Sequence, residues 1–159
     1  MASVFVELDV SGRRVEVMVA PMTTLQSVLR QLGFTSVKEG CRQGGCGSCT
    51  VLVDGEPMPS CLLPAEDVAG RPVTTVEGIT PSEGLAPIQA AFVAANAFQC
   101  GYCTPGMLML ATALLQQDPN PSREEVIEAL AGNVCRCTGY LPIVDAVEAA
   151  ATGTGEAAR

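Results

Sequence analysis

The chain has 159 residues, a formal net charge of −8, eight cysteines and no histidine. The acidic charge argues against a nucleic-acid partner, because phosphate binding needs a basic surface and only nine lysines and arginines are scattered along the chain. The absence of histidine removes the commonest general base, so we expect no substrate chemistry by this chain alone.

The first half of the chain is predicted to form strands. Apolar residues alternate with polar ones over residues 4–10 and 15–19, which is the period of strands with one buried face. Thr24 is the expected N-cap of a short helix with an apolar stripe, and Gly33 ends that helix. Further strands are expected over residues 50–53, 57–62 and 73–76. These elements predict a compact α+β unit.

The second half is predicted to be helical, because the apolar period changes at about Pro81. We expect four helices: residues 88–97, residues 104–118, a helix opened by the capping box of Ser122 and Glu125, and a helix from about Tyr140. Residues 66–87 are rich in glycine, proline and threonine, and they are predicted to connect the two units.

No segment predicts a membrane span or export. The longest strongly apolar stretch, residues 107–115, is too short to cross a bilayer. The N-terminus MASVFVELDV lacks the basic start and apolar run of a signal peptide. Free or metal-bound thiols are then typical of a reducing compartment, so we expect the protein in the cytoplasm.

The first four cysteines have a characteristic spacing, Cys41-x4-Cys46-x2-Cys49-x11-Cys61. The C-x4-C-x2-C…C pattern is that of plant-type [2Fe–2S] ferredoxins. Glycines are interleaved with the first three cysteines. Glycine allows the positive φ angles and the close approach with which a loop directs its amides at a cluster. The loop is therefore predicted to hold an iron–sulfur centre.

The other four cysteines are Cys100-x2-Cys103 and Cys135-x-Cys137, and each pair comes just before a predicted helix. The positive end of the helix dipole and the unpaired N–H groups there favour thiolate charge. Two helix hairpins would bring the two loops together around one cluster. Two complete sets of four thiolates predict two metal centres and an electron-carrying chain.

Other uses of the cysteines stay open at this point. A disulfide framework also uses an even number of cysteines, but it is typical of short secreted chains. Structural zinc takes four thiolates as well, but its sites use two C-x2–4-C knuckles, and Cys135-Arg136-Cys137 has too short a gap. The absence of histidine excludes a Rieske centre. A zinc-binding interaction module and a diffusible ferredoxin are the alternative functions.

The cysteine motifs and their flanks resemble the iron–sulfur subunit of the molybdenum hydroxylases, the family of xanthine dehydrogenase, aldehyde oxidoreductase and aerobic carbon monoxide dehydrogenase. The resemblance includes the first cysteine set, QCGYCTPG at residues 99–106 and GNVCRCTGY at residues 132–140, and it covers essentially the whole chain. It implies a β-grasp, plant-type [2Fe–2S] ferredoxin domain over residues 1–78. A four-helix domain with a second [2Fe–2S] cluster would follow over residues 79–159.

The resemblance also implies roles and partners. The chain would be the non-catalytic electron-transfer subunit of an oxidoreductase, beside a large molybdopterin-binding catalytic subunit and a medium FAD-binding subunit. FAD or another acceptor would receive the electrons. Electrons would pass from molybdenum to the cluster of the second cysteine set and then to that of the first. Gln99 would hydrogen-bond the pterin, and Cys137 would lie on the path from pterin to iron. Arg42 departs from the family pattern and would shift the potential of the first cluster.

Overall fold

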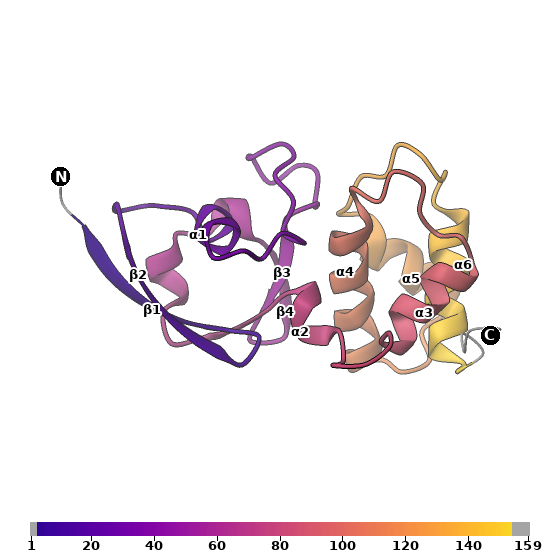
Figure 1. Ribbon diagram of the computed structural model, residues 1–159. Helices are drawn as coiled ribbons and strands as arrows, with labels where there is room; N and C mark the ends of the chain where they lie inside the picture. Colours follow the sequence, from indigo (N-terminus) through magenta and orange to yellow (C-terminus); the bar gives the residue numbers. More distant parts are fainter. Residues whose placement is uncertain (1–2, 154–159) are drawn as a thin grey trace.

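The computed structural model describes residues 3–153, which form a β half and a helical half side by side (Figure 1). The β half begins with an antiparallel hairpin of β1 (Val4–Val10) and β2 (Arg13–Val19). Helix α1 (Leu25–Gln31) follows and is capped by the Thr24 side chain, which accepts a hydrogen bond from the amide of Ser27. Gly33 lies just beyond its end with a φ of 93°. The predicted hairpin and helix are confirmed.

Three more strands complete a five-stranded sheet in the order β2-β1-β5-β3-β4. They are β3 (Thr50–Val53), β4 (Glu56–Pro59) and β5 (Pro72–Thr74). Strand β5 is central: it runs parallel to β1 and antiparallel to β3. The sheet and α1 enclose an apolar core that includes Leu8, Leu29 and Val51.

Several parts of the β half differ from the sequence-based prediction. The strand expected over residues 57–62 ends at Pro59, and Ser60–Leu62 form a 3-10 turn, η1, in which the Ser60 hydroxyl donates to the carbonyl of Cys49 at 2.7 Å. The strand expected over residues 73–76 ends at Thr74, and α2 (Val76–Ile79) begins there. The expected connector, residues 66–87, overlaps this strand, β5, which is central in the sheet, and it also contributes most of a second 3-10 turn, η2 (Ala65–Val68).

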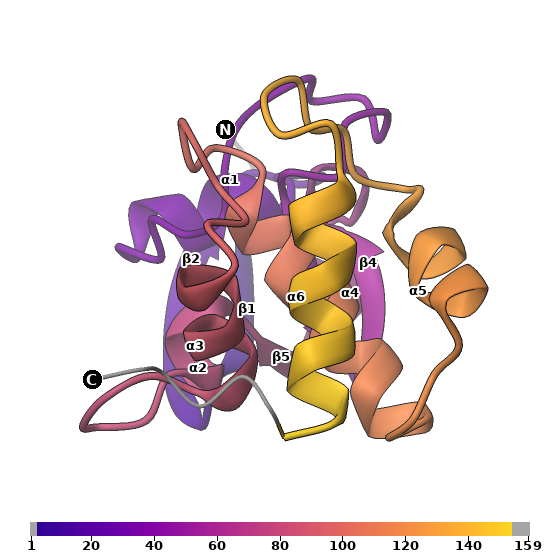
Figure 2. The same ribbon diagram turned by 90° about the vertical axis from the view of Figure 1, so that its right-hand side faces the viewer.

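The helical half contains four helices after α2, as predicted. They are α3 (Pro87–Ala94), α4 (Thr104–Gln117), α5 (Arg123–Leu130) and α6 (Leu141–Ala151). Figure 2 shows α6 in front of α4, with α3 and α5 on its two sides. The capping box of α5 is present: the amide of Glu125 donates to the Ser122 hydroxyl at 3.3 Å, and the Glu125 carboxylate accepts from the Ser122 amide. No helix within residues 3–153 has the length and hydropathy to span a membrane.

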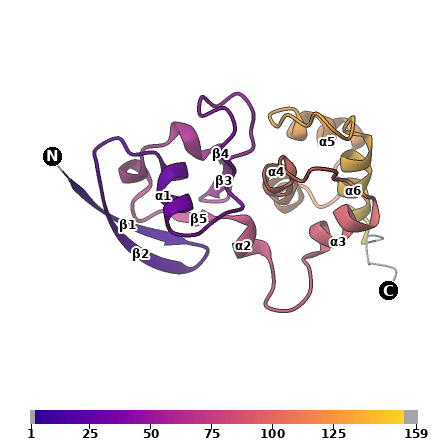
Figure 3. The same cartoon turned by 45° about the horizontal axis from the view of Figure 1, so that its top comes forward.

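Helix α4 joins the two halves. All four residues of β3 are buried, so this strand is covered on both faces. Leu52 of β3 packs against Met109 and Ala113 of α4. The other side of α4 contributes Met107 and Leu108 to the core of the helical half. Figure 3 shows α4 as the helix that lies next to β3 and β4.

Candidate metal centres

The first cysteine set lies in the loop between α1 and β3 and in η1. Cys41 and Cys46 are half-buried, whereas Cys49 and Cys61 are buried. The thiols meet in two pairs, because Cys41 is in hydrogen-bonding contact with Cys46 and Cys49 with Cys61. The structure therefore brings all four predicted residues of this set to one end of the β half.

Hydrogen-bond donors of the same loop are directed at these sulfurs. The amide of Gly44 donates to the Sγ of Cys61 at 3.3 Å, and the amide of Gln43 donates to the Sγ of Cys41 at 3.5 Å. The hydroxyl of Ser48 donates to the Sγ of Cys46 at 3.4 Å. Donors to sulfur stabilise thiolate charge, which is what an iron ligand needs.

Two glycines of the loop leave room that a side chain would fill. A Cβ at Gly40 would lie 2.8 Å from the Sγ of Cys46. Gly44 has a φ of +78°, and a Cβ there would lie 2.5 Å from a methyl carbon of Leu62. The loop can fold around the sulfurs in this way because both residues lack a side chain.

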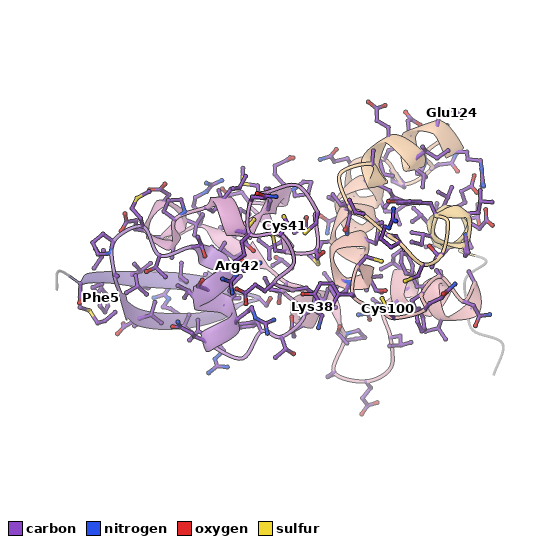
Figure 4. All side chains as sticks on the ribbon, turned by 90° about the horizontal axis from the view of Figure 1, so that it is seen from above. Phe5, Lys38, Cys41, Arg42, Cys100 and Glu124 are labelled. Atoms are coloured by element: carbon purple, nitrogen blue, oxygen red, sulfur yellow. The ribbon has the colours of Figure 1, made fainter. Side chains whose placement is uncertain are left out.

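The second cysteine set lies in two loops at the same end of the molecule as the first. Cys103 is the N-cap residue of α4, and Cys135 and Cys137 precede α6. The Sγ atoms of Cys100 and Cys137 are 3.6 Å apart, and Cys103 contacts Cys135. Cys41 is seen on the β half and Cys100 on the helical half in Figure 4. The loops before two different helices thus meet, with their thiols again in pairs.

Hydrogen bonds favour the thiolate at one cysteine of each set. Donation from the amide of Gln43, and from Cys46, lowers the pKa of Cys41 to about 7. Burial opposes ionisation of Cys135, but the hydroxyl and amide of Thr138 outweigh it and the pKa of Cys135 falls to about 7. The Sγ of Cys135 lies 3.2 Å from the Thr138 hydroxyl oxygen.

The more deeply placed thiols have raised pKa values. Burial raises the pKa of Cys49 to about 11 and that of Cys103 to about 12. The exposed thiol of Cys137 also has a raised pKa, and there the main cause is hydrogen bonding with Cys100. Without a cation these thiols stay protonated at neutral pH, so a bound metal would have to displace their protons.

The pairwise arrangement decides which metal centre the residues fit. All eight cysteines are free, and a separation of 3.6 Å between sulfurs is far longer than the ~2.05 Å of a disulfide. Two pairs of thiols per set match a cluster with two irons, each of which takes two thiolates. The donors and glycines of the first loop, and the contact of Cys135 with Thr138 in the second set, fit such a cluster.

Gln99 and Cys137 meet on the surface of the helical half. The side-chain amide Nε2 of Gln99 donates to the carbonyl oxygen of Cys137 at 3.1 Å, and both residues are exposed. Arg136 is exposed between the two cysteines of its loop. On the β half, Arg42 has a φ of 57° and forms an ion pair with Glu39. The ammonium of Lys38 donates to the carbonyl of Thr35 at 2.9 Å.

Contacts between the two cysteine regions were not anticipated from the sequence. The amide of Val134 donates to the carbonyl of Cys46 at 3.0 Å, and the hydroxyl of Tyr102 donates to the carbonyl of Glu39 at 2.7 Å. Asn133 is fully buried and donates through Nδ2 to the carbonyl of Cys103 at 3.2 Å. The only signal for these residues was their place inside the two motifs of the second cysteine set.

The chain matches two sequence families along almost all of its length. Residues 8–74 match the family described as 2Fe-2S iron-sulfur cluster binding domain. Residues 75–148 match the family described as [2Fe-2S] binding domain. The two matched segments correspond to the two cysteine sets.

Similar proteins are known from several bacteria. The small subunit of nicotine 6-hydroxylase from Paenarthrobacter nicotinovorans is 49% identical over 143 residues, which are 89% of this chain and 86% of that protein. The small FeS subunit of nicotinate dehydrogenase from Eubacterium barkeri is 41% identical over 148 residues, which are 92% and 94% of the two chains. A chain in the crystal structure of quinoline 2-oxidoreductase from Pseudomonas putida 86 superposes with a TM-score of 0.91 at 42% identity, covering 96% of each chain.

Proposed function

Because the chain belongs to the small iron–sulfur subunits of the molybdenum hydroxylases, we propose a course for electrons through its residues. The chain is the electron-transfer subunit of a multi-subunit oxidoreductase, with two [2Fe–2S] clusters and a large molybdopterin-bearing partner. Each cluster, when bound, accepts and releases one electron at a time. We assign the ligands from the geometry of the chain. The entry side and the exit side are those that the family resemblance implies, and the exposure of the residues there supports them.

The four thiol pairs are the observation that carries the ligand assignment. The first cluster is assigned to Cys41 with Cys46 and Cys49 with Cys61. The second cluster is assigned to Cys100 with Cys137 and Cys103 with Cys135. In each set one pair is more exposed than the other, so each cluster would have one side toward the surface and one toward the protein.

Electrons are proposed to enter at the second cluster. Gln99 and Cys137 are exposed and tied together, so they present a polar group and a ligand at the same surface. The same loops carry exposed apolar side chains at Phe98 and Val134, and the neighbouring Leu141 is 65% exposed. Exposed apolar groups of this kind mark a docking surface. The large subunit would cover it, with the pterin hydrogen-bonded by Gln99 and close to Cys137.

Electrons are proposed to leave at the first cluster. On the β half, the loop of this cluster carries the half-buried Cys41 and, next to it, the exposed Arg42. A medium FAD-bearing subunit would receive electrons at this loop. The Arg42 guanidinium would stabilise the more negative, reduced state of a neighbouring cluster and so raise its potential. The ion pair with Glu39 holds that guanidinium in place.

The domain boundary and the location of the protein are part of the proposal. We place the boundary after Gly78, so that residues 1–78 form the ferredoxin-like domain and residues 79–159 the four-helix domain. The eight free cysteines support a reducing compartment, and the cytoplasm is the location proposed.

Purification of the native protein without a tag tests this function. We expect the chain to elute with a large molybdenum-containing chain, identified by mass spectrometry, in a preparation whose visible absorption bleaches on reduction with dithionite. An obligate interface of this kind commonly buries more than about 2,000 Å². A lone chain that is fully active, or one that is colourless and contains zinc, would contradict the proposal.

A further inference from the structure

Asn133 is a polar residue placed where the two halves of the molecule meet. It is fully buried, between the end of α5 and the ligand Cys135. Its side-chain Nδ2 donates to the carbonyl of Cys103, and its backbone amide donates to the carbonyl of Leu130. Its Oδ1 is buried without a hydrogen-bond partner among the described residues. Burying a polar atom in this way is unfavourable, so an apolar residue would suit this position better if only core packing mattered.

Two glycines allow Asn133 to be wedged between the halves. A Cβ at Gly47, in the first cysteine loop, would lie 2.7 Å from the Cα of Asn133 and 2.4 Å from the carbonyl oxygen of Gly132. A Cβ at Gly106, in the first turn of α4, would lie 2.4 Å from the Nδ2 of Asn133. It would also lie 2.5 Å from the carbonyl oxygen of Gly47. Asn133 is therefore closely packed between the first cysteine loop and α4.

The residue after Asn133 makes the direct link between the two cysteine sets. The amide of Val134 donates to the carbonyl of Cys46 at 3.0 Å, and Cys135 is the next residue. The path from Cys46 of the first set to Cys135 of the second set therefore consists of covalent bonds and one hydrogen bond. Electron tunnelling weakens steeply when a bonded path is interrupted or lengthened, so the position of this bond matters for transfer between the clusters.

On the basis of the proposed two-cluster relay, we propose that Asn133 is the positioning residue that sets the spacing between the two clusters. It fixes Cys103 through its side chain and holds Val134 against Cys46 through its own packing on Gly47. A smaller side chain at this position removes none of the eight thiols. It loosens the contact between the first cysteine loop and the second, and so slows transfer from the second cluster to the first.

The test uses Asn133→Ala in the native complex. The readouts are iron content, the EPR signals of the two reduced clusters with the magnetic splitting between them, and stopped-flow reduction of each cluster by substrate. We expect unchanged iron content and an unchanged rate for the second cluster. We also expect weaker splitting and a several-fold slower reduction of the first cluster. Unchanged splitting and an unchanged rate for the first cluster would overturn the proposal.

Two further variants keep the result interpretable. Val147→Ala removes buried apolar volume from α6 in the same helical core and should leave the splitting intact. Gly106→Ala keeps Asn133 and all cysteines but pushes on the Asn133 side chain, so it should also weaken the splitting. If the Asn133→Ala variant loses a cluster, the Gly106→Ala variant becomes the test. Unchanged splitting in Gly106→Ala, or loss of a cluster in that variant as well, would overturn the spacing role of Asn133. A wild-type complex without two coupled signals would instead contradict the proposed function itself.

Discussion

The side-chain amide of Gln99 donates a hydrogen bond to the carbonyl of Cys137, at 3.1 Å, across the two loops of the second cysteine set. The donor and the acceptor belong to segments that are far apart in the sequence, so this bond helps to hold Cys100 and Cys137 side by side. Both residues are exposed, which leaves the remaining polar atoms of Gln99 accessible to a partner.

Replacement of Gln99 by alanine should slow electron entry while both clusters are retained. Both clusters should be retained because Gln99 is not one of the cysteine ligands. Loss of one hydrogen bond to a buried cofactor costs about 1–3 kcal/mol, and about 1.4 kcal/mol corresponds to a tenfold slower step. The measurement is the rate of cluster reduction by substrate in a stopped-flow experiment, together with iron content. Gln116→Ala, an exposed glutamine near the other end of α4, is the matched control. Reduction of Gln99→Ala at the wild-type rate would show that Gln99 does not contact the pterin.

Replacement of Cys137 by serine should remove or cripple only the second cluster, because a hydroxyl is a much poorer iron ligand than a thiolate. We expect iron to fall from about four atoms per chain to about two, with the signal of the first cluster retained. Cys41→Ser is the complementary variant and should spare the second cluster instead. Full iron content in either variant would argue against the ligand assignment.

Gly44→Ala should weaken the first cluster, whereas Gly45→Ala should be tolerated. The φ of Gly44 is +78°, and a side chain in this region costs about 1–2 kcal/mol. The new Cβ would also push Leu62 away from the loop, which displaces the amide that donates to Cys61. A Cβ at Gly45 meets nothing within 4 Å. The check is the temperature at which each variant loses its visible absorption. Equal losses in the two variants would contradict this account of the loop.

Thiol reactivity in the cluster-free chain should follow the pKa values. Cys41, with a pKa of about 7, should be alkylated fastest, and its rate should rise as the pH increases through 7 because the thiolate is the reactive form. Cys49 and Cys103, with pKa values of about 11 and 12, should react slowly over the same range. Site-resolved mass spectrometry after brief alkylation measures each rate. In denaturant all three should react alike. The same equality without denaturant would show that the loops need their clusters to fold.

Much of the fold was accessible from the sequence because local signals agree with the tertiary structure. The Thr24 cap, the Ser122–Glu125 capping box and the alternation in β1 act within a few residues. A strand near β5 was expected, but its central position in the sheet was not, because β5 has only three residues and pairs with strands that are distant in the sequence. The strand expected to include Cys61 was wrong because the buried hydrogen bond from Ser60 to Cys49 turns the chain there.

The candidate sites likewise combine features that the sequence predicts with contacts that it does not. The cysteines can be recognised by their spacing, since the thiolate ligands of each cluster come in closely spaced groups from the loops that surround it. The pairing of Cys100 with Cys137 depends on how two helices pack, and the contact of Asn133 with Gly47 depends on how two domains pack. No local pattern in the sequence specifies contacts of that kind.

The most direct test of the relay is EPR spectroscopy of the dithionite-reduced native complex, combined with iron analysis per chain. The two ligand sets have different surroundings, a glycine-rich loop beside a sheet and two loops before helices, so their clusters should differ in signal. We expect two distinct rhombic signals and about four irons per chain. A single signal, with only about two irons per chain, would contradict the two-cluster relay.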